Sequence, residues 1–434
     1  MITKYIKSIF SLQYLKNNKT VKVILKFTSG NLVVSIISAL SMLLYGIWIG
    51  PEVLGELRQF GILTSYFGLL LILVDAGFRR SYILEVGNDN IKKSKKIAEV
   101  AQFAYVGLTF IGLTVFLSLT IIALLEGDMR SAVGWATQIA VLTVLVYGSY
   151  YNTLYKSNNE FLTLNRNNIQ SAIFSFLLLP LVYYFEYFGL ALRQFSTKSM
   201  QFFLNRLRSP LKISPKRNWT ELKRLAKVSV PLQFPAMLES SVIKPSTNLF
   251  ILFYFSKEGL GLFSYALLMQ SFFMTLGVSI NQIFITKFNL FYAKKTSYVA
   301  SVKYMMKPIV FIFILGLIIT IIISFSLPNL IDFIVPKYSK SGVIFGVLIF
   351  QLVFKLLASP LSILSISLKY KERLFLTLIK SFFLLLMIFF FPKKIIYIAY
   401  AMVFSEAIFI LLGYLFIGIE YRKELINIKL GNNG

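Results

Sequence analysis

The chain has 434 residues, of which 57% are hydrophobic and 16% aromatic, whereas only 15% carry a charge. A soluble domain carries about a quarter charged residues, so this composition excludes an ordinary soluble enzyme. The net charge of +27 would indicate nucleic-acid binding in a soluble protein. In a membrane protein it indicates Lys and Arg retained in cytoplasmic loops. Cysteine and histidine are absent, which excludes disulfides, thiol catalysis and Cys/His metal sites.

Apolar stretches of about 20 residues recur along the whole chain, each long enough to cross a hydrocarbon core of about 30 Å. They predict an all-α integral membrane protein with about twelve transmembrane helices. The first 26 residues show no cleavage-site pattern and predict a basic cytoplasmic leader before a retained first helix. The expected spans, in chain order, are 27–49, 58–84, 98–125, 131–155, 166–184, 188–206, 228–255, 259–286, 305–327, 340–368, 374–391 and 395–418.

The connections alternate in charge. Lys and Arg are concentrated in the leader and in the connections after the second, sixth, eighth and tenth spans. The other connections are short and poor in Lys and Arg, except those with Lys337, Lys340, Lys393 and Lys394. The positive-inside rule therefore places both termini in the cytoplasm, which requires an even number of spans. Twelve fits, and ten would follow if the fifth and sixth segments formed one interfacial excursion.

The sixth span, 188–206, is the least certain to insert because it contains Arg193 and Lys198. A charge at the centre of a helix costs about 2.5–3.5 kcal/mol on insertion scales. Either the segment lies on the membrane surface, or it spans with both cations facing a watery interior. The alternating loop charges favour the spanning form.

The two halves of the chain share a short repeat. At a constant offset of 206, Glu52 matches Glu258, Leu54 matches Leu260, Gly55 matches Gly261 and Asp75 matches Asn281. These matches predict an N-terminal six-helix lobe (1–205), a basic cytoplasmic linker (206–227) and a C-terminal six-helix lobe (228–434). Six helices per unit give a parallel repeat, and transporters of this build place their substrate site near the midplane between the halves.

Ionisable residues within spans are candidates for function because burying them is costly. Asp75 precedes Arg79 by four residues, a spacing that predicts a pair on one helix face; such a pair either gates transport or merely permits insertion. The seventh span holds Glu239 and Lys244 among three prolines, which predicts a kinked helix that lines a cavity. The alternative for these two residues is structural pairing with neighbouring helices.

Cations outnumber anions within the spans. Arg193, Lys198, Lys244 and Lys355 are set against Asp75, Glu239 and Glu406, which predicts a buried cavity suited to an anionic group such as a pyrophosphate. The intramembrane amides are candidates for binding sugar hydroxyls, although interhelical hydrogen bonds are the favoured interpretation for most of them. They are Gln138, Gln170, Gln270, Asn281, Gln282 and Gln351.

Catalytic motifs are missing from the sequence. No P-loop is present, so the chain does not carry ATP hydrolysis itself, and nothing predicts a cofactor or a metal site. No long extracytoplasmic loop exists to hold an active site. The sequence therefore predicts a transporter and not an enzyme.

Four short segments resemble a known family. Residues 50–55 (GPEVLG) with 75–80 (DAGFRR), and residues 226–231 (AKVSVP) with 260–266 (LGLFSYA), resemble the signatures of the polysaccharide-unit (O-antigen) flippases. This family shares a superfamily with multidrug and toxin extruders and with the lipid II flippase. The sequence departs from the pattern at Glu56 and Leu57, where an aromatic residue commonly follows the glycine, and in its unusually polar sixth span.

The resemblance implies a twelve-helix, V-shaped transporter of the bacterial inner membrane, working by alternating access and driven by an ion gradient. Its substrate would be an oligosaccharide unit on a polyprenyl pyrophosphate, moved from the cytoplasmic to the periplasmic leaflet during O-antigen, lipopolysaccharide or capsule biosynthesis. Membrane lipids, a polysaccharide polymerase and assembly proteins would be partners, and nucleic acid would not. We expect Arg193, Lys198, Lys244 and Lys355 to bind substrate.

Coupling or gating is expected of Asp75, Arg79 and Glu239. Two alternative functions stay open at this point. A multidrug or cation extruder of the same superfamily would require an acidic cavity. A membrane polymerase or ligase acting on lipid-linked glycans would require a substantial periplasmic loop that bears catalytic groups.

Overall fold

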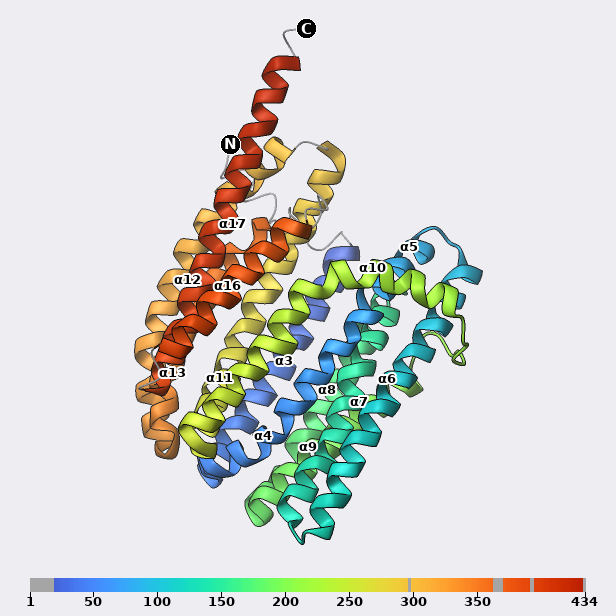
Figure 1. The fold of residues 1–434 in the computed structure, drawn as a ribbon. Helices are drawn as coiled ribbons and strands as arrows, with labels where there is room; N and C mark the ends of the chain where they lie inside the picture. Colours follow the sequence, from blue (N-terminus) through green and yellow to red (C-terminus); the bar gives the residue numbers. More distant parts are fainter. Residues whose placement is uncertain (1–18, 296–297, 362–369, 391–393, 432–434) are drawn as a thin grey trace.

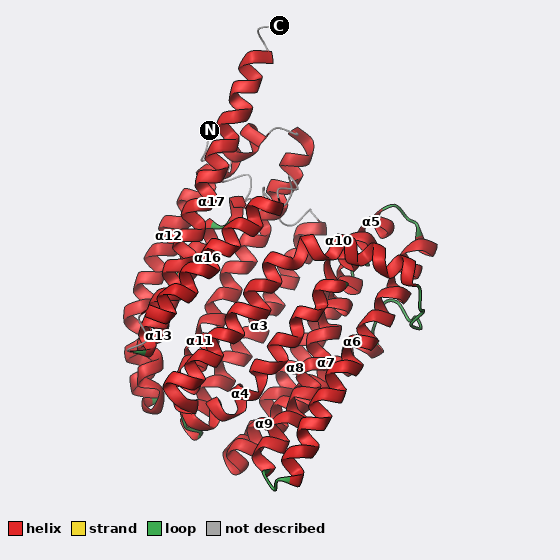
Figure 2. Cartoon of the chain, viewed as in Figure 1, coloured by secondary structure: helices red, strands yellow, loops and turns green. Residues whose placement is uncertain are grey.

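The computed structural model describes residues 19–295, 298–361, 370–390 and 394–431, and this part of the chain is almost entirely helical and contains no strands (Figures 1 and 2). The first half contains α3 (Lys19–Trp48), α4 (Pro51–Phe67), η1 (Gly68–Leu73), α5 (Asp75–Gly87), α6 (Ile91–Leu125), α7 (Met129–Ser157), α8 (Phe161–Leu177) and α9 (Leu179–Leu207). The second half contains α10 (Trp219–Met237), η2 (Leu238–Ile243), α11 (Lys244–Lys295), α12 (Tyr298–Ile334), η3 (Pro336–Tyr338), α13 (Ser339–Leu348), α14 (Gln351–Leu357), η4 (Ser359–Leu361), α16 (Tyr370–Phe390) and α17 (Ile395–Gly431).

These helices correspond to the predicted spans. The second span is α4, η1 and α5 in series, and the tenth is α13 and α14. Eight helices of the described part are long and apolar enough to cross a membrane, or nine if α8 and α9 count as one broken span. The predicted spans that fall short by composition are those formed by α8, α9, α10 and α11.

The helices α8 and α9 form a hairpin. The chain reverses at Glu186, whose φ of 43° lies outside the helical region. Beyond this turn α9 runs back along the preceding segment: Arg193 Nε donates to the Ser175 carbonyl at 2.8 Å, and Asn167 Nδ2 donates to the Leu204 carbonyl at 3.4 Å. The fifth and sixth segments are therefore two antiparallel stretches of helix, and whether they cross the membrane as two spans stays a prediction.

The bundle has two ends that differ in their connections. The end with the short turns at Gly50, Gly127, Glu186 and Ser256 is called here the tight-turn end, and Figure 1 shows it at the bottom. The opposite end carries residues 208–218, a non-helical segment called here the strap. The strap lies on the first half, because the backbone N–H of Lys216 donates to the Glu99 carbonyl at 3.2 Å and its ammonium is 3.1 Å from the Glu99 carboxylate.

The halves meet at the tight-turn end through α4 and α11, at the two glycines that the repeat matches. A Cβ atom on Gly55 would lie 1.8 Å from the carbonyl oxygen of Lys257, and one on Gly261 would lie 1.7 Å from that of Pro51. Lys257 and Pro51 are themselves separated by the repeat offset of 206. The two helices thus cross backbone to backbone, as small residues permit where lipid supplies no hydrophobic driving force.

Lys337, which departed from the loop-charge pattern, lies at the same end. Its ammonium donates to the carbonyls of Ile47 and Trp48, both at 3.2 Å. These are the last carbonyls of α3, which have no partner within the helix. A cation at this position satisfies them and complements the negative end of the helix dipole. Lys337 therefore joins the second half of the chain to the first.

The buried core of the described residues has one cluster that spans both halves, one mainly in the first half that also includes Leu225 of α10, and one in the second half. The shared cluster includes Tyr45, Leu54, Leu260, Tyr265 and Tyr338 near the α4–α11 crossing. A cluster rich in aromatic rings fills the first half and contains Phe78, Tyr105 and Tyr150, and a small cluster around Ile309, Leu376 and Ile410 fills the second half. The matched side chain Asn281 and its neighbour Gln282 lie outside the part of the chain whose side chains the structure describes.

Candidate functional site

A cavity of about 580 Å³ lies among α3, α4, α8, α9 and the second part of α11. Its wall on α9 is formed by residues spaced along one helix face: Leu190, Arg193, Gln194, Thr197, Lys198 and Gln201. The sixth span therefore presents its polar face to an interior space, as the spanning interpretation required. The neighbouring helices add small hydroxyl and amide groups at Ser38, Ser41, Asn168, Ser171 and Ser175.

The charges in this cavity have one sign. Arg193 and Lys198 line it together with Arg58 of α4, and the described lining contains no aspartate or glutamate. Arg193 is held in place from two directions, because its Nε donates to the Ser175 carbonyl at 2.8 Å and its guanidinium lies 5.6 Å from the Tyr45 ring centroid. The cavity is therefore an anion-attracting space with at least one oriented guanidinium.

A second cavity, of about 210 Å³, lies in the second half among η2, α11, α14, α16 and α17. Lys244 and Lys355 line it, and so do Glu239, Lys380 and Glu406. The four predicted substrate cations are thus divided between two cavities, and the prediction of a single cationic cavity was wrong. The residues of α9 line only the first cavity and those of α14 only the second, a separation that loop charges and hydropathy do not encode.

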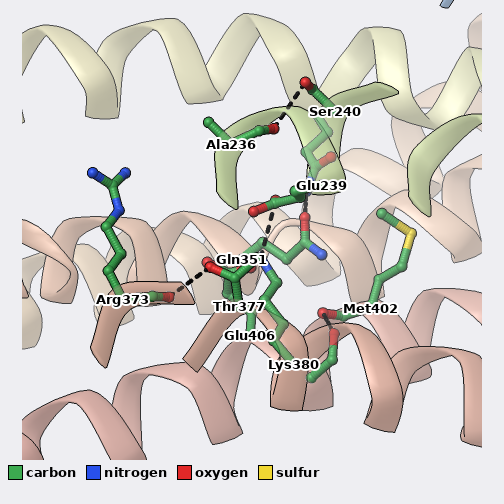
Figure 3. A network of polar contacts seen from close by, with 11 residues as sticks. Ala236, Glu239, Ser240, Gln351, Arg373, Thr377, Lys380, Met402 and Glu406 are labelled. Carbon is green, nitrogen blue, oxygen red and sulfur yellow. Dashed lines mark hydrogen bonds and ion pairs between the residues drawn. The ribbon is translucent and has the colours of Figure 1, made fainter. Parts of the chain in front are cut away.

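Carboxylates surround a lysine in the second cavity. Lys380 Nζ lies 3.0 Å from Glu239 Oε1 and also forms an ion pair with Glu406, as Figure 3 shows from close by. Nearby, Gln270 Nε2 donates to Gln351 Oε1 at 2.9 Å. Glu239, predicted to carry a coupling ion, is therefore engaged by a side chain of the protein itself.

Asp75 lies in a third polar region, at the junction of η1 and α5 in the first half. It is buried, and its carboxylate accepts hydrogen bonds from Tyr105 at 2.9 Å, from Gln233 at 3.0 Å and from Ser149. The predicted pairing with Arg79 is not formed in the structure, since the Arg79 side chain is exposed and the carboxylate is occupied by these three donors. Helical spacing makes such a pair possible, but the partners that α6, α7 and α10 supply take precedence.

The helix α10 closes against Asp75 from the second half. The Ala76 backbone N–H donates to Gln233 Oε1 at 2.7 Å and to Ser229 Oγ at 3.2 Å. A Cβ atom on Gly77, the next residue of α5, would lie 2.1 Å from the carbonyl of Leu225, which is one turn before Ser229 on α10. The first part of α10 thus packs on α5, and residues 219–227 of the predicted linker are its opening turns.

Between α10 and α11 the seventh span changes its winding. Residues Leu238–Ile243 form a π-helix, preceded by Pro231 and Pro235 and followed by Pro245. Proline removes a backbone donor and clashes with the preceding turn, and π-helical turns occur where an α-helix accommodates an irregularity. The kink that the three prolines predict is therefore present, and Glu239 lies within it.

The amides expected to serve mainly as interhelical links do so wherever the structure describes them. Gln138 Oε1 accepts from Thr64 at 2.9 Å, and Gln170 Oε1 accepts from Arg208 at 2.5 Å. With the Gln270–Gln351 pair, these bonds join α4 to α7, α8 to the start of the strap, and α11 to α14.

Arg58 and Lys380 line the two cavities but were not predicted from the sequence. Arg58 is the first residue of the expected second span, a position at which a cation is usually interpreted as an interfacial anchor. Lys380 lies within the expected span 374–391 and is a charge surrounded by apolar residues, which is the signal that would have identified it.

No family model matches the chain, and no curated protein matches it. Solved structures do. An inward-facing multidrug resistance MATE family transporter of the MOP superfamily has a TM-score of 0.66 at 13% identity, over 90% of this chain and 95% of that chain. An outward-facing MATE transporter has a TM-score of 0.56 at 14% identity, over 93% and 96%. The chain has the MATE transporter fold.

A further neighbour is a MOP superfamily transporter from Pyrococcus furiosus Vc1 (DSM3638), described by a binding pocket of reverse polarity that suggests a different function. Its TM-score is 0.58 at 14% identity, over 92% of this chain and 96% of that chain. At these identities the likeness concerns architecture: a helical membrane transporter fold with two lobes. A fold does not determine function, which depends on the side chains described above.

Proposed function

We propose that the protein is an alternating-access flippase that moves a polyprenyl-pyrophosphate-linked oligosaccharide from the cytoplasmic to the outer leaflet of the bacterial inner membrane. The observation that supports this most is the 580 Å³ cavity lined by Arg58, Arg193 and Lys198 without a carboxylate among its described lining residues. Such a cavity attracts a phosphate group and repels a cationic drug. The proposal gives Arg193 and Lys198 the role of binding the pyrophosphate.

The chemistry of the lining suits both parts of this substrate. Guanidinium and ammonium groups form charge-assisted hydrogen bonds with phosphate oxygens, which are about twice as strong as neutral ones. Burial away from bulk water strengthens the attraction further. The serines and amides of α3 and α8 add donors and acceptors for sugar hydroxyls. In this scheme Lys244 and Lys355, in the second cavity, contact a later unit of the glycan.

The ends of the bundle support the proposed orientation. The strap end carries the basic segment 206–227 and the loop with Lys92, Lys93, Lys95 and Lys96, which the positive-inside rule assigns to the cytoplasm. At the tight-turn end the halves are joined by the Gly55–Gly261 crossing. The higher TM-score against the inward-facing neighbour than against the outward-facing one agrees with a state closed at the tight-turn end.

Gating in this proposal involves Asp75, Arg79 and Glu239. Asp75 holds α10 against the first half, so its bond to Gln233 must change if α10 moves away from α5, whereas its bond to Tyr105 lies within the first half. Glu239 lies on the π-helical segment that joins α10 to α11. Arg79 is exposed one turn after Asp75, where it is placed to bind lipid phosphates.

A leaflet assay tests the proposal. The purified protein in proteoliposomes should expose a fluorescent lipid-linked oligosaccharide to an external quencher or lectin. Arg193→Ala and Lys198→Ala should lose this activity while remaining folded. Arg166→Ala removes an exposed cation from α8 and serves as the matched control.

Two outcomes would overturn the proposal. Extrusion of a cationic dye such as ethidium, without movement of the glycolipid, would favour the multidrug extruder, an alternative that the fold accommodates equally well. Lengthening of the glycan on its lipid carrier would favour a polymerase or ligase. Full activity of both Arg193→Ala and Lys198→Ala would show that these residues do not bind the pyrophosphate, even if the wild type moves the glycolipid.

A further inference from the structure

Lys380 occupies a point on which two carboxylates converge from different helices. Glu239 comes from η2 and Glu406 from α17, while Lys380 comes from α16 (Figure 3). The Lys380 and Glu406 side chains are only 9% and 8% exposed, whereas that of Glu239 is 35% exposed. The Lys380 ammonium also lies 5.4 Å from the centroid of the Phe409 ring. It is therefore held from three directions.

This arrangement has the chemistry of a small cation site. Carboxylate oxygens from separate elements that meet at one point are the usual ligands of hard metal ions. Two neighbouring carboxylates without a cation between them would repel each other, which favours protonation of one of them. Here the positive charge belongs to the chain itself, at the end of a flexible four-carbon stem.

The two carboxylates differ in how firmly they are held. Glu406 lies in the regular helix α17 and is buried. Glu239 lies on the π-helical segment between Pro235 and Pro245, where the seventh span is irregular, and it faces the cavity. Bending of a helix is concentrated at prolines and π-helical turns. A change in the angle between α10 and α11 therefore moves Glu239 relative to Lys380 more than it moves Glu406.

We propose that Glu239 and Glu406 form a cation site which the protein fills with its own Lys380 ammonium in place of a free metal ion. Glu239 is the releasable ligand of this site and leaves Lys380 when the seventh span bends, while Glu406 keeps the ammonium neutralised. The inference rests on the chain being a transporter and is independent of the identity of its substrate. It follows that Lys380 excludes Na⁺ and K⁺ from this site while it contacts both carboxylates.

Removing the lysine should turn the site into one that binds a free ion. The melting temperature of the purified protein is measured in NaCl and in choline chloride at equal ionic strength. The wild type should melt at the same temperature in both. Lys380→Ala should melt about 3 °C or more higher in NaCl, because an ion that binds only the folded state stabilises it. Adding Glu406→Gln to this variant should abolish the difference.

Two further variants separate the proposed role from plain structural pairing. Lys380→Arg keeps a cation in place and should show no Na⁺ dependence. Lys371→Ala removes an exposed lysine from the same helix and should behave as the wild type. If Lys380→Ala melts equally in both salts, the carboxylates do not form a cation site and the proposal is wrong.

A second measurement applies if Lys380→Ala does not fold. Stability of the wild type and of Glu239→Gln is then compared across NaCl, KCl and choline chloride. No salt-specific effect in either protein supports a site filled by Lys380. A Na⁺-specific stabilisation of the wild type that Glu239→Gln abolishes would show that a free ion binds there and would overturn the proposal. Neither measurement uses the glycolipid, so failure of the leaflet assay leaves their result intact.

Discussion

Gly55 and Gly261 each lie where the other helix leaves no room for a side chain. The Cβ position of Gly55 falls 1.8 Å from the Lys257 carbonyl oxygen and that of Gly261 falls 1.7 Å from the Pro51 carbonyl oxygen. Because the same offset of 206 relates Gly55 to Gly261 and Pro51 to Lys257, the contact is reciprocal. The short sequence repeat thus marks the place where the two halves are in direct contact.

Alanine at either glycine should destabilise the protein. The new methyl group meets backbone atoms, which cannot rotate away, so we expect a loss of about 1–3 kcal/mol for each of Gly55→Ala and Gly261→Ala. Thermal unfolding of the purified protein measures this loss. Gly107→Ala is the control, because a Cβ there meets open space. A Gly55→Ala protein as stable as the control would contradict the crossing.

Arg58 should matter to transport as much as Lys198 does. Both line the cavity without an opposing carboxylate among its described lining residues. A charge-assisted hydrogen bond to a buried anion contributes about 1.5–3 kcal/mol. Arg58→Ala should therefore weaken glycolipid binding about 10- to 100-fold. Binding of the glycolipid to protein in detergent measures this, and an unchanged affinity with a normal melting temperature would exclude Arg58 from the site.

Asp75→Asn should destabilise the first half of the molecule. The carboxylate accepts from Tyr105, Ser149 and Gln233, and an amide nitrogen in its place opposes one of these donors. We expect a cost of about 1.5–3 kcal/mol, against about 1 kcal/mol for Tyr105→Phe. Arg79→Ala should stay within about 0.5 kcal/mol of the wild type, because its side chain is exposed. A large loss for Arg79→Ala, measured by thermal unfolding, would restore the predicted pair.

Asp128 predicts a dependence of stability on pH. It caps α7 in the turn after α6, and hydrogen bonds from the Ser131 hydroxyl and backbone N–H lower the pKa of its carboxyl below the ordinary 3.8. A lowered pKa means that the cap stabilises the helix above this value and is lost as the pH falls through the folded-state pKa. Asp128→Ala should therefore melt below the wild type near neutral pH, and the two curves should converge in acid.

The apolar stretches sufficed to predict the helical architecture because their length follows directly from the thickness of the membrane. The spans and the hairpin at Glu186 match expectation, including the polar helix with Arg193 and Lys198. The direction in which each buried charge points was harder to predict. Arg79 is four residues from Asp75 yet exposed, and Lys244 lies in a different cavity from Lys198. Such directions depend on the rotation of each helix about its axis, which packing decides.

The sequence predicted the type of candidate site but not the full set of residues that form it. An excess of cations over anions predicted an anion-attracting cavity, and Arg193 and Lys198 line one cavity together with Arg58. Lys380 was not predicted because it is a single charge within a long run of apolar residues, so the mean hydropathy of the segment stays high. Its two partners lie 141 and 26 residues away in the sequence, so no local pattern announces them.

Under the proposed alternating-access function, the α4–α11 crossing would also determine how far the opposite ends of the lobes travel. Its contact atoms belong to the main chain, so no change of rotamer loosens it, and it acts as a fulcrum. A helix rises about 1.5 Å per residue, which puts a point 20 residues away about 30 Å from this fulcrum. A rotation of about 10° then moves that point by roughly 5 Å across a hydrocarbon layer about 30 Å thick. The close contact that Gly55 and Gly261 permit at one end of the bundle would thus set the size of the opening at the other end.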